Sequence, residues 1–285
     1  LNVGATRQFR VKTSGIGKLD AWIDFNRDGT FSASEKLGGA SGLSVPAGFS
    51  TVSFNIPNKI PMESNPILAA LDVPSAEKAM ALAEDIYPHV GGFKIGLELF
   101  TNGGSNTVKT IQALGKEIFL DLKFHDIPNT VAKAVANATK LNVQWMTIHC
   151  AGGPEMIKAA EQSAQETASS LGIAPPVILG VTVLTSMDQS QLSAIGVQHG
   201  VEDQVAALAE MAVSHGLRGL VCSPLELTRL RSLVPPSVHL VTPGIRAQKD
   251  AMGDQKRTLG PKEAIAAGAS RLVIGRPIYA APHPA

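Results

Sequence analysis

The chain has 285 residues, of which 44% are hydrophobic, 17% charged and 5% aromatic, and its 25 basic and 24 acidic residues leave a formal net charge of +1. This length can bury a large core, either as one α/β barrel or as two smaller domains. A charge so close to zero favours neither nucleic acid nor an anionic membrane as a partner. No apolar run reaches the roughly 20 residues of a membrane span, and the first residues do not resemble a signal peptide. We therefore expect neither nucleic-acid nor membrane binding.

Residues 1–57 have the pattern of a small all-β segment. Short alternating runs are separated by Gly- and Ser-rich turns, and no helical period occurs among them. The predicted strands are Gln8–Thr13, Leu19–Phe25 and Ser50–Ile56. Pro57 and Pro61 would interrupt a strand ladder or a helix, so we interpret residues 58–65 as a linker.

A calcium-loop pattern lies inside this β-rich segment. Residues 24–35 fit D-x-N-x-D-G-x₅-E, with a turn glycine at Gly29 and a final carboxylate that can bind bidentately. The candidate calcium ligands are Asp24, Asn26, Asp28, Thr30 and Glu35. An EF-hand would need flanking helices, whereas a strand is predicted here, and the segment resembles the calcium-loop β-modules of secreted bacterial proteins. The alternative is an Asx-rich hairpin turn that binds no metal.

From residue 66 onward, the pattern is strand, loop and helix, repeated. Parallel strands buried on both faces are continuously apolar and need helical crossovers, so this pattern predicts a parallel sheet. A count of eight strands favours closure into a (β/α)₈ TIM barrel over an open doubly wound sheet. The predicted strands are Ile67–Val73, Phe93–Ile95, Ile118–Leu122, Trp145–Ile148, Val177–Val183, Gly219–Cys222, His239–Val241 and Arg271–Ile274. The clearest predicted helices are Ala76–Ile86, Val131–Lys140 and Glu202–His215.

Charged residues interrupt three consecutive predicted strands near their carboxyl ends, where barrels of this type carry their chemistry. These residues are Asp72, Lys94, Asp121 and Lys123, with Asp126 in the loop that follows. Residues two apart on a strand face the same side, so Asp121 and Lys123 should point together. An ion-pair network at the barrel rim is the alternative to a functional site, but desolvating this many charges without a use is costly.

Cysteines and histidines indicate neither a disulfide framework nor a metal cluster. Cys150 and Cys222 fall in strand-like segments, and we expect buried free thiols in a reducing compartment. The seven histidines are mostly isolated along the chain. His125 and His149 should lie beside the charged residues, and we interpret both as structural.

The ten-residue run 121–130, Asp-Leu-Lys-Phe-His-Asp-Ile-Pro-Asn-Thr, resembles the signature of the orotidine 5′-phosphate decarboxylase family, in its bacterial form. Further segments resemble the same family in order and spacing: 71–75, 94–96, 181–186, 241–246, 253–255 and 274–277. The resemblance implies a (β/α)₈ barrel over residues 66–285. Because the family normally continues past residue 277 with a final helix, we expect this chain to lack that helix.

The resemblance implies decarboxylation of orotidine 5′-phosphate to UMP, the last step of de novo pyrimidine synthesis, without metal or cofactor. Lys123 matches the general acid that stabilises and then protonates the developing carbanion. Asp121 would lie against the departing carboxylate, and Lys94 and Asp126 would complete an alternating array. Asp126 and Thr130 are expected from the second subunit of a homodimer that shares its active site.

The resemblance also implies how the rest of the substrate is held. The expected substrate-binding residues are Asp72, Lys94, Thr130, Thr185, Ser186, Arg246, Gln255, Gly275 and Arg276. Gly275 and Arg276 follow the eighth strand, where backbone N–H groups and a guanidinium commonly bind phosphate. Arg246 and Gln255 flank a glycine-containing loop that could close over the ligand. Asp72 and Lys94 match residues that hold the ribose hydroxyls, and Thr185 and Ser186 match residues at the pyrimidine edge.

Two alternatives stay open. A related barrel that decarboxylates or condenses sugar phosphates shares Asp-x-Lys-x-x-Asp but uses Mg²⁺ to stabilise an enediolate, although the run Ile127–Thr130 favours the pyrimidine enzyme. The second alternative is a secreted, calcium-stabilised protein with an inactive barrel, which the pattern in residues 24–35 favours. A nucleotide-synthesising enzyme should be cytoplasmic, whereas the amino-terminal segment suggests a secreted origin.

Overall fold

The computed structural model describes residues 65–246, 259–281 and 284, together with the backbone of six short strands between residues 6 and 55. The chain divides into two compact units, Leu1–Asn65 and Pro66–Ala285.

The first unit consists of antiparallel strand pairs. Its longest strands, β1 (Thr6–Thr13) and β6 (Gly48–Asn55), pair along their full length. Two described strands fall in or overlap the predicted strand over 19–25. They are β2 (Gly17–Leu19) and β3 (Ala21–Trp22), and each pairs with a different strand. Their partners are β5 (Leu43–Val45) and β4 (Lys36–Leu37), respectively. The five candidate calcium ligands lie outside the described residues.

The second unit is a closed barrel of parallel strands, as the sequence predicts. The chain order continues around the barrel from β7 to β14, and β14 pairs with β7 to close it. The strands are β7 (Ile67–Ala70), β8 (Gly92–Gly96), β9 (Glu117–Phe124), β10 (Trp145–His149), β11 (Val177–Val181), β12 (Gly219–Val221), β13 (His239–Thr242) and β14 (Arg271–Ile274). All eight predicted strands are confirmed, but β7, β11 and β12 end earlier than expected. Their last predicted residues leave the ladder and form the loops at the barrel mouth.

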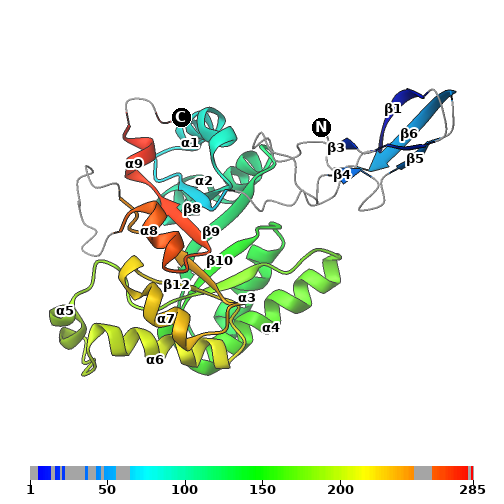
Figure 1. Cartoon of the computed structure of the whole chain (residues 1–285). Coiled ribbons are helices and arrows are strands. Elements are labelled where there is room, and N and C mark those ends of the chain that lie inside the picture. Colours follow the sequence, from blue (N-terminus) through cyan, green and yellow to red (C-terminus); the bar gives the residue numbers. More distant parts are fainter. Residues whose placement is uncertain are drawn as a thin grey trace. The chain divides into compact units, whose positions relative to one another are not determined.

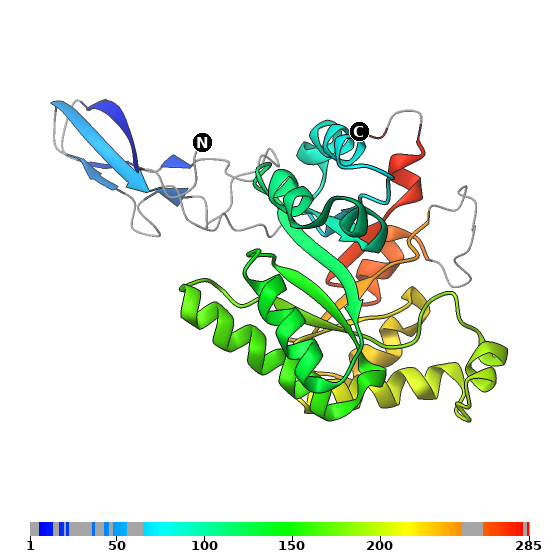
Figure 2. The same ribbon diagram turned by 180° about the vertical axis from the view of Figure 1, so that it is seen from behind.

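Helices surround the barrel on its outer side, which the two opposite views in Figures 1 and 2 show. They are α1 (Ala76–Ile86), α2 (Leu97–Gln112), α3 (Pro128–Thr139), α4 (Gly153–Leu171), α5 (Gln189–Ala194), α6 (Val201–Ser214), α7 (Leu227–Leu233), α8 (Pro261–Ala266) and α9 (Arg276–Tyr279). Short 3₁₀ turns occur at Tyr87–His89, Cys150–Gly152 and Pro224–Glu226.

Helix α1 shows how local sequence produces these elements. The Ser75 hydroxyl accepts a hydrogen bond from the Lys78 N–H, which satisfies a backbone donor that the first turn leaves unpaired. Ala79, Ala83 and Ile86 then follow at helical spacing and are buried against the barrel.

The core has two layers because barrel strands alternate between inside and outside. Leu68 and Ala70 belong to the interior cluster, whereas Ala69 between them belongs to the larger cluster under the helices. The same alternation turns Phe93 and Ile95 outward, which leaves Lys94 facing the barrel interior. The charged residues of the predicted site therefore lie above an apolar interior layer.

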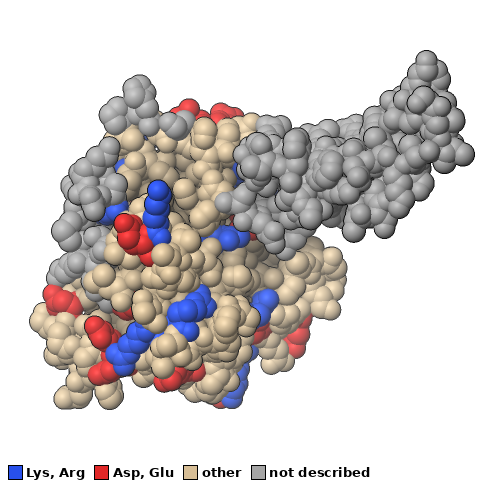
Figure 3. Space-filling model, in the orientation of Figure 1, with Lys and Arg blue, Asp and Glu red and all other residues tan. Residues whose placement is uncertain are grey.

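Charges of both signs are interspersed on the described surface in Figure 3. This distribution agrees with the near-zero formal charge of the chain. Within the part of the chain that the structure describes, no helix has the length and apolar character needed to cross a bilayer.

Candidate active site

A cavity of about 510 Å³ is lined by residues from the carboxyl-terminal ends of the barrel strands. Ala70, Phe119 and Val273, from the apolar interior of the barrel, contribute to its lining. The structure brings together nine residues of the predicted site around this cavity: Asp72, Lys94, Asp121, Lys123, Thr185, Ser186, Arg246, Gly275 and Arg276.

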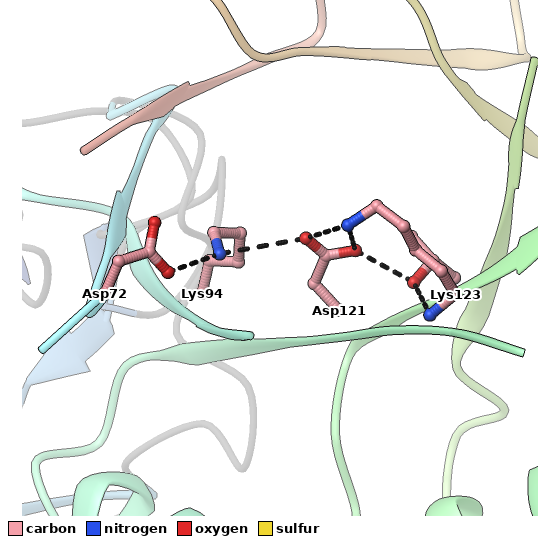
Figure 4. A network of polar contacts seen from close by, with 5 residues as sticks. Asp72, Lys94, Asp121 and Lys123 are labelled. Atoms are coloured by element: carbon pink, nitrogen blue, oxygen red, sulfur yellow. Dashed lines mark hydrogen bonds and ion pairs between the residues drawn. The ribbon is translucent and has the colours of Figure 1, made fainter. Parts of the chain in front are cut away.

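Four charged side chains of alternating sign form a row of ion pairs in the cavity (Figure 4). The Lys94 Nζ atom lies 2.9 Å from Asp72 Oδ1 and 3.7 Å from Asp121 Oδ2. The Lys123 Nζ atom lies 2.8 Å from Asp121 Oδ2 and 2.9 Å from Asp121 Oδ1. The Asp121 carboxylate is therefore held between two ammonium groups that come from different strands.

The environment of Asp121 keeps its carboxyl group ionised. Its side chain is 11% exposed and that of Lys94 is 10% exposed, so both charges are largely removed from water. Burial alone would raise the pKa of Asp121, but the charges of Lys94 and Lys123 and the hydrogen bonds to this carboxylate lower that pKa below its usual value. Lys123 is more accessible, with 29% of its side chain exposed, and its ammonium is available to a molecule in the cavity.

Strand β9 is irregular where it carries Asp121 and Lys123. Lys123 has a φ of 49°, a left-handed conformation that is uncommon for a residue other than glycine. Its backbone N–H donates to Thr147 Oγ1 on β10 at 2.8 Å. The predicted contact between Asp121 and Lys123 is present, but a regular strand with simple alternation does not describe how the chain achieves it.

Thr147 contacts both Asp121 and Lys123, although the sequence pattern did not predict it as a site residue. Its side chain is fully buried, and its hydroxyl donates to Asp121 Oδ1 at 3.0 Å. A single polar residue inside the predicted apolar run Trp145–Ile148 was the available signal. That signal is weak, because a buried threonine can equally bond to a nearby backbone carbonyl.

The cavity lining also includes arginine, hydroxyl and backbone groups. Arg246 follows β13, and Gly275 and Arg276 lie at the junction of β14 and α9. Thr185 and Ser186 line the cavity from the loop after β11. The four charged side chains of the ion-pair row therefore line the same cavity as two guanidinium groups and two hydroxyl groups. Such a set of donors suits a substrate that carries several negative charges.

Three predicted residues are not brought into this cavity by the described chain. Asp126 and Thr130 are exposed and are absent from the described lining. The Asp126 carboxylate instead accepts a hydrogen bond from the N–H of the next residue, Ile127. Gln255 lies outside the described residues.

Two histidines, His125 and His149, lie close to each other near the charged side chains. The rings of His125 and His149 lie 5.3 Å apart, and burial, together with the charges of His125 and Lys123, lowers the pKa of His149. Cys150 and Cys222 are buried and neither forms a disulfide, as predicted, and Cys222 also lines the cavity. Across residues 65–246 and 259–281, no group of three or more His, Cys, Asp or Glu is placed to hold a metal ion.

The fold and site define a (β/α)₈ barrel whose charged cavity lies at the carboxyl-terminal mouth. Comparison with protein families gives a match over residues 65–285 to the orotidine 5′-phosphate decarboxylase / HUMPS family. The chain belongs to this family. A second match, to the GEVED domain, covers residues 18–67 and includes the candidate calcium loop.

Similar proteins support the assignment to this family. The chain is 50% identical over 221 residues to orotidine 5′-phosphate decarboxylase of Paramagnetospirillum magneticum, covering 78% of this chain and 94% of that protein. It is 45% identical to the Moorella thermoacetica protein of the same name, covering 76% of this chain and 87% of that protein. A crystal structure of orotidine 5′-phosphate decarboxylase from Lactobacillus acidophilus is 35% identical, with a TM-score of 0.68 and coverage of 78% and 94%.

Proposed function

We propose that this chain decarboxylates orotidine 5′-phosphate to UMP and CO₂, with no metal or organic cofactor in the chemical step. The observation that carries the proposal is the alternation of Asp72, Lys94, Asp121 and Lys123 in one cavity, at contacts of 2.8–3.7 Å. The family match of this chain and its similarity to proteins named orotidine 5′-phosphate decarboxylase support the proposal.

Lys123 is the proposed proton donor. The bond between pyrimidine C6 and the carboxylate breaks, the electron pair stays on C6, and CO₂ leaves. The ammonium group stabilises this pair and then transfers a proton to C6, which yields UMP and a neutral amine that water reprotonates. Because the ion pairs with Asp121 hold the ammonium before charge develops, little reorganisation is needed during the reaction.

Asp121 and Lys94 have supporting roles in the proposed reaction. Asp121 lies beside the departing carboxylate and orients the Lys123 ammonium through both of its oxygens. Lys94 lowers the free-energy cost of burying the Asp121 carboxylate, because the Lys94 ammonium lies 3.7 Å from Asp121 Oδ2. Lys94 also bonds Asp72, and we propose that this pair holds the ribose hydroxyls.

The rest of the nucleotide is bound away from the reacting carbon. We assign the phosphate to Arg246, Gly275 and Arg276, which line the same cavity, together with Gln255. Thr185 and Ser186 would contact the pyrimidine edge. Contacts to the non-reacting phosphate can stabilise a closed state and so assist the chemical step.

The proposed active form is a homodimer in which each subunit completes the site of the other. Asp126 and Thr130 are exposed on the single chain, which agrees with their use by a second subunit. Mixing inactive Lys123→Ala and Asp126→Ala proteins should restore part of the activity, because hybrid dimers contain one site with both residues intact. No recovery despite confirmed subunit exchange would count against a shared site.

The direct test is the loss of orotidine 5′-phosphate absorbance with the purified full chain, with and without EDTA. Turnover that EDTA leaves unchanged supports the proposal. Turnover that EDTA abolishes and Mg²⁺ restores would contradict a chemical step that needs no metal. No turnover of orotidine 5′-phosphate under either condition would contradict the proposal.

A second proposal concerns the amino-terminal segment, because its residues combine the calcium-loop pattern with the GEVED match over 18–67. We propose Ca²⁺ binding by oxygen ligands from Asp24, Asn26, Asp28, Thr30 and Glu35. The full chain should gain thermal stability in Ca²⁺ relative to EDTA, and Glu35→Gln should remove most of that gain. Melting that is independent of Ca²⁺ would leave a non-binding turn as the better interpretation.

A further inference from the structure

A β-bulge lies where the catalytic segment of β9 runs beside β10. Met146 pairs with Leu120, but Ile148 pairs with Phe124. The chain therefore advances four residues along β9, from Leu120 to Phe124, where it advances only two along β10. Thr147 is the residue of β10 between these two pairs. It therefore lies opposite the irregular stretch that carries Asp121 and Lys123.

The Thr147 hydroxyl makes one contact with each of these two residues. It must accept from the Lys123 backbone N–H, at 2.8 Å, because an N–H can only donate. It must then donate its own proton to Asp121 Oδ1, at 3.0 Å, because an ionised carboxylate can only accept. The two partners thus determine the direction of both hydrogen bonds.

The backbone of Lys123 needs such a partner. Its φ of 49° is a conformation that costs free energy for a residue with a side chain, and it persists only where surrounding contacts hold it. Thr147 is fully buried, so water cannot readily replace its hydroxyl in these contacts.

We propose that Thr147 is a positioning residue that places the Lys123 ammonium and the Asp121 carboxylate relative to each other through one hydroxyl group. This inference rests on the proposed decarboxylase function and extends it to a residue that does not line the described cavity. Without the hydroxyl, Lys123 can relax from its left-handed conformation and Asp121 can rotate. Small displacements of reacting groups reduce the rate more than they reduce binding.

The test compares Thr147→Val, which has nearly the same shape without a hydroxyl, with Thr147→Ser, which keeps the hydroxyl. Loss of a hydrogen bond to a charged group should lower kcat for orotidine 5′-phosphate by about 10- to 100-fold in Thr147→Val, with KM changed by less than about threefold. Thr147→Ser should restore kcat to within about threefold of the original chain. Thr139→Val is the matched control, because Thr139 is equally buried but its hydroxyl donates to the Val135 carbonyl within α3.

The pH profile separates positioning from a general structural effect. Burial raises the pKa of Asp121, whereas Lys94, Lys123 and the Thr147 hydroxyl lower it below its usual value. Removing the hydroxyl should therefore move the acid limb of the kcat profile to higher pH in Thr147→Val. Neither Thr147→Ser nor Thr139→Val should move it.

Three outcomes would overturn the role of Thr147: wild-type kcat in Thr147→Val, equal losses in Thr147→Val and Thr147→Ser, or an equal loss in Thr139→Val. If Thr147→Val does not fold, Thr147→Cys, which retains a weak donor, replaces it in the same comparison. Absence of turnover in the unsubstituted chain would instead contradict the proposed function. The two failures are therefore distinguishable.

Discussion

At the scale of single residues, the site depends on one carboxylate. Asp121 accepts hydrogen bonds from the Lys123 ammonium and the Thr147 hydroxyl, and the Lys94 ammonium lies nearby. Its pKa is lowered in the folded state, so the stabilisation from its ionised form is present above the unfolded-state pKa of about 3.8 and is lost as pH falls through the folded-state value. Asp121 therefore remains ionised throughout the neutral range.

Replacing Lys123 with alanine should abolish decarboxylation while leaving nucleotide binding measurable. Loss of both electrostatic stabilisation and proton donation should reduce kcat by at least about 10³-fold. UMP formation measures the rate, and titration with UMP measures binding. Lys158→Ala is the control, because Lys158 is exposed and makes a surface ion pair with Glu155 on α4. Full activity of Lys123→Ala would refute the assigned role.

The Cys150 thiol should be unreactive in the native protein. Burial raises its pKa to about 12, so very little thiolate is present at pH 8. Iodoacetamide should leave Cys150 unmodified in the folded chain and modify it after denaturation, as measured by peptide mass. Rapid native modification of Cys150 would mean that the strand end opens more readily than its burial implies.

At the scale of elements, close contact between neighbouring strands restricts side-chain size. A Cβ atom on Gly92 of β8 would lie 2.6 Å from the Glu117 carbonyl oxygen and 2.8 Å from Leu68 Cδ2. The backbone oxygen cannot move without disturbing the pairing of β8 with β9. This glycine therefore permits the spacing that brings Lys94 close to Asp121.

Gly92→Ala should destabilise the barrel by about 1–3 kcal/mol, because the added methyl group overpacks the strand interface. Denaturant unfolding followed by the helical circular dichroism signal measures the change. Gly200→Ala is the matched control: Gly200 has ordinary φ and ψ values, and an added Cβ would lie 3.8 Å from both Asp203 Oδ2 and Gln189 Oε1. Equal stability of the two variants would show that β8 and β9 can separate at little cost.

The sequence predicted which segments form strands better than it predicted irregularities within those strands. Continuous apolar runs identified all eight barrel strands, because burial on both faces leaves a strong signal in each strand. The bulge beside Thr147 had no comparable signal, since it arises from the mismatch between β9 and β10. Strand alternation correctly predicted that Asp121 and Lys123 meet. It did not predict the left-handed backbone at Lys123.

At the scale of the whole molecule, two half-buried histidines make the stability of the barrel depend on pH. Burial and the charges of Arg271 and Arg218 lower the pKa of His239, and burial and the charges of His125 and Lys123 lower that of His149. The unfolded chain then binds more protons at and below the usual histidine pKa of about 6.5. Stability should therefore rise with pH through this range.

Urea midpoints should increase from pH 5 to pH 7, and His239→Phe should reduce that increase. Phenylalanine keeps an aromatic ring beside Trp145, whose ring centroid lies 5.1 Å from that of His239, but removes the titrating group. The helical signal at 222 nm is the suitable measurement, since all the described helices lie in the barrel unit. An unchanged pH dependence in His239→Phe would show that this histidine does not contribute.

The sequence by itself determined the number and order of barrel strands, the division between β-rich and α/β regions, and the residues that carry charge at the strand ends. Hydrophobic periodicity and the run 121–130 are local properties, so they can be recognised without coordinates. The tertiary structure alone decided that Thr147 bonds both Asp121 and Lys123, and that the Asp126 carboxylate accepts a hydrogen bond from the Ile127 N–H in the loop after β9. These relations depend on the register between neighbouring strands and on the direction of the loops that follow them, which arise only when the barrel closes.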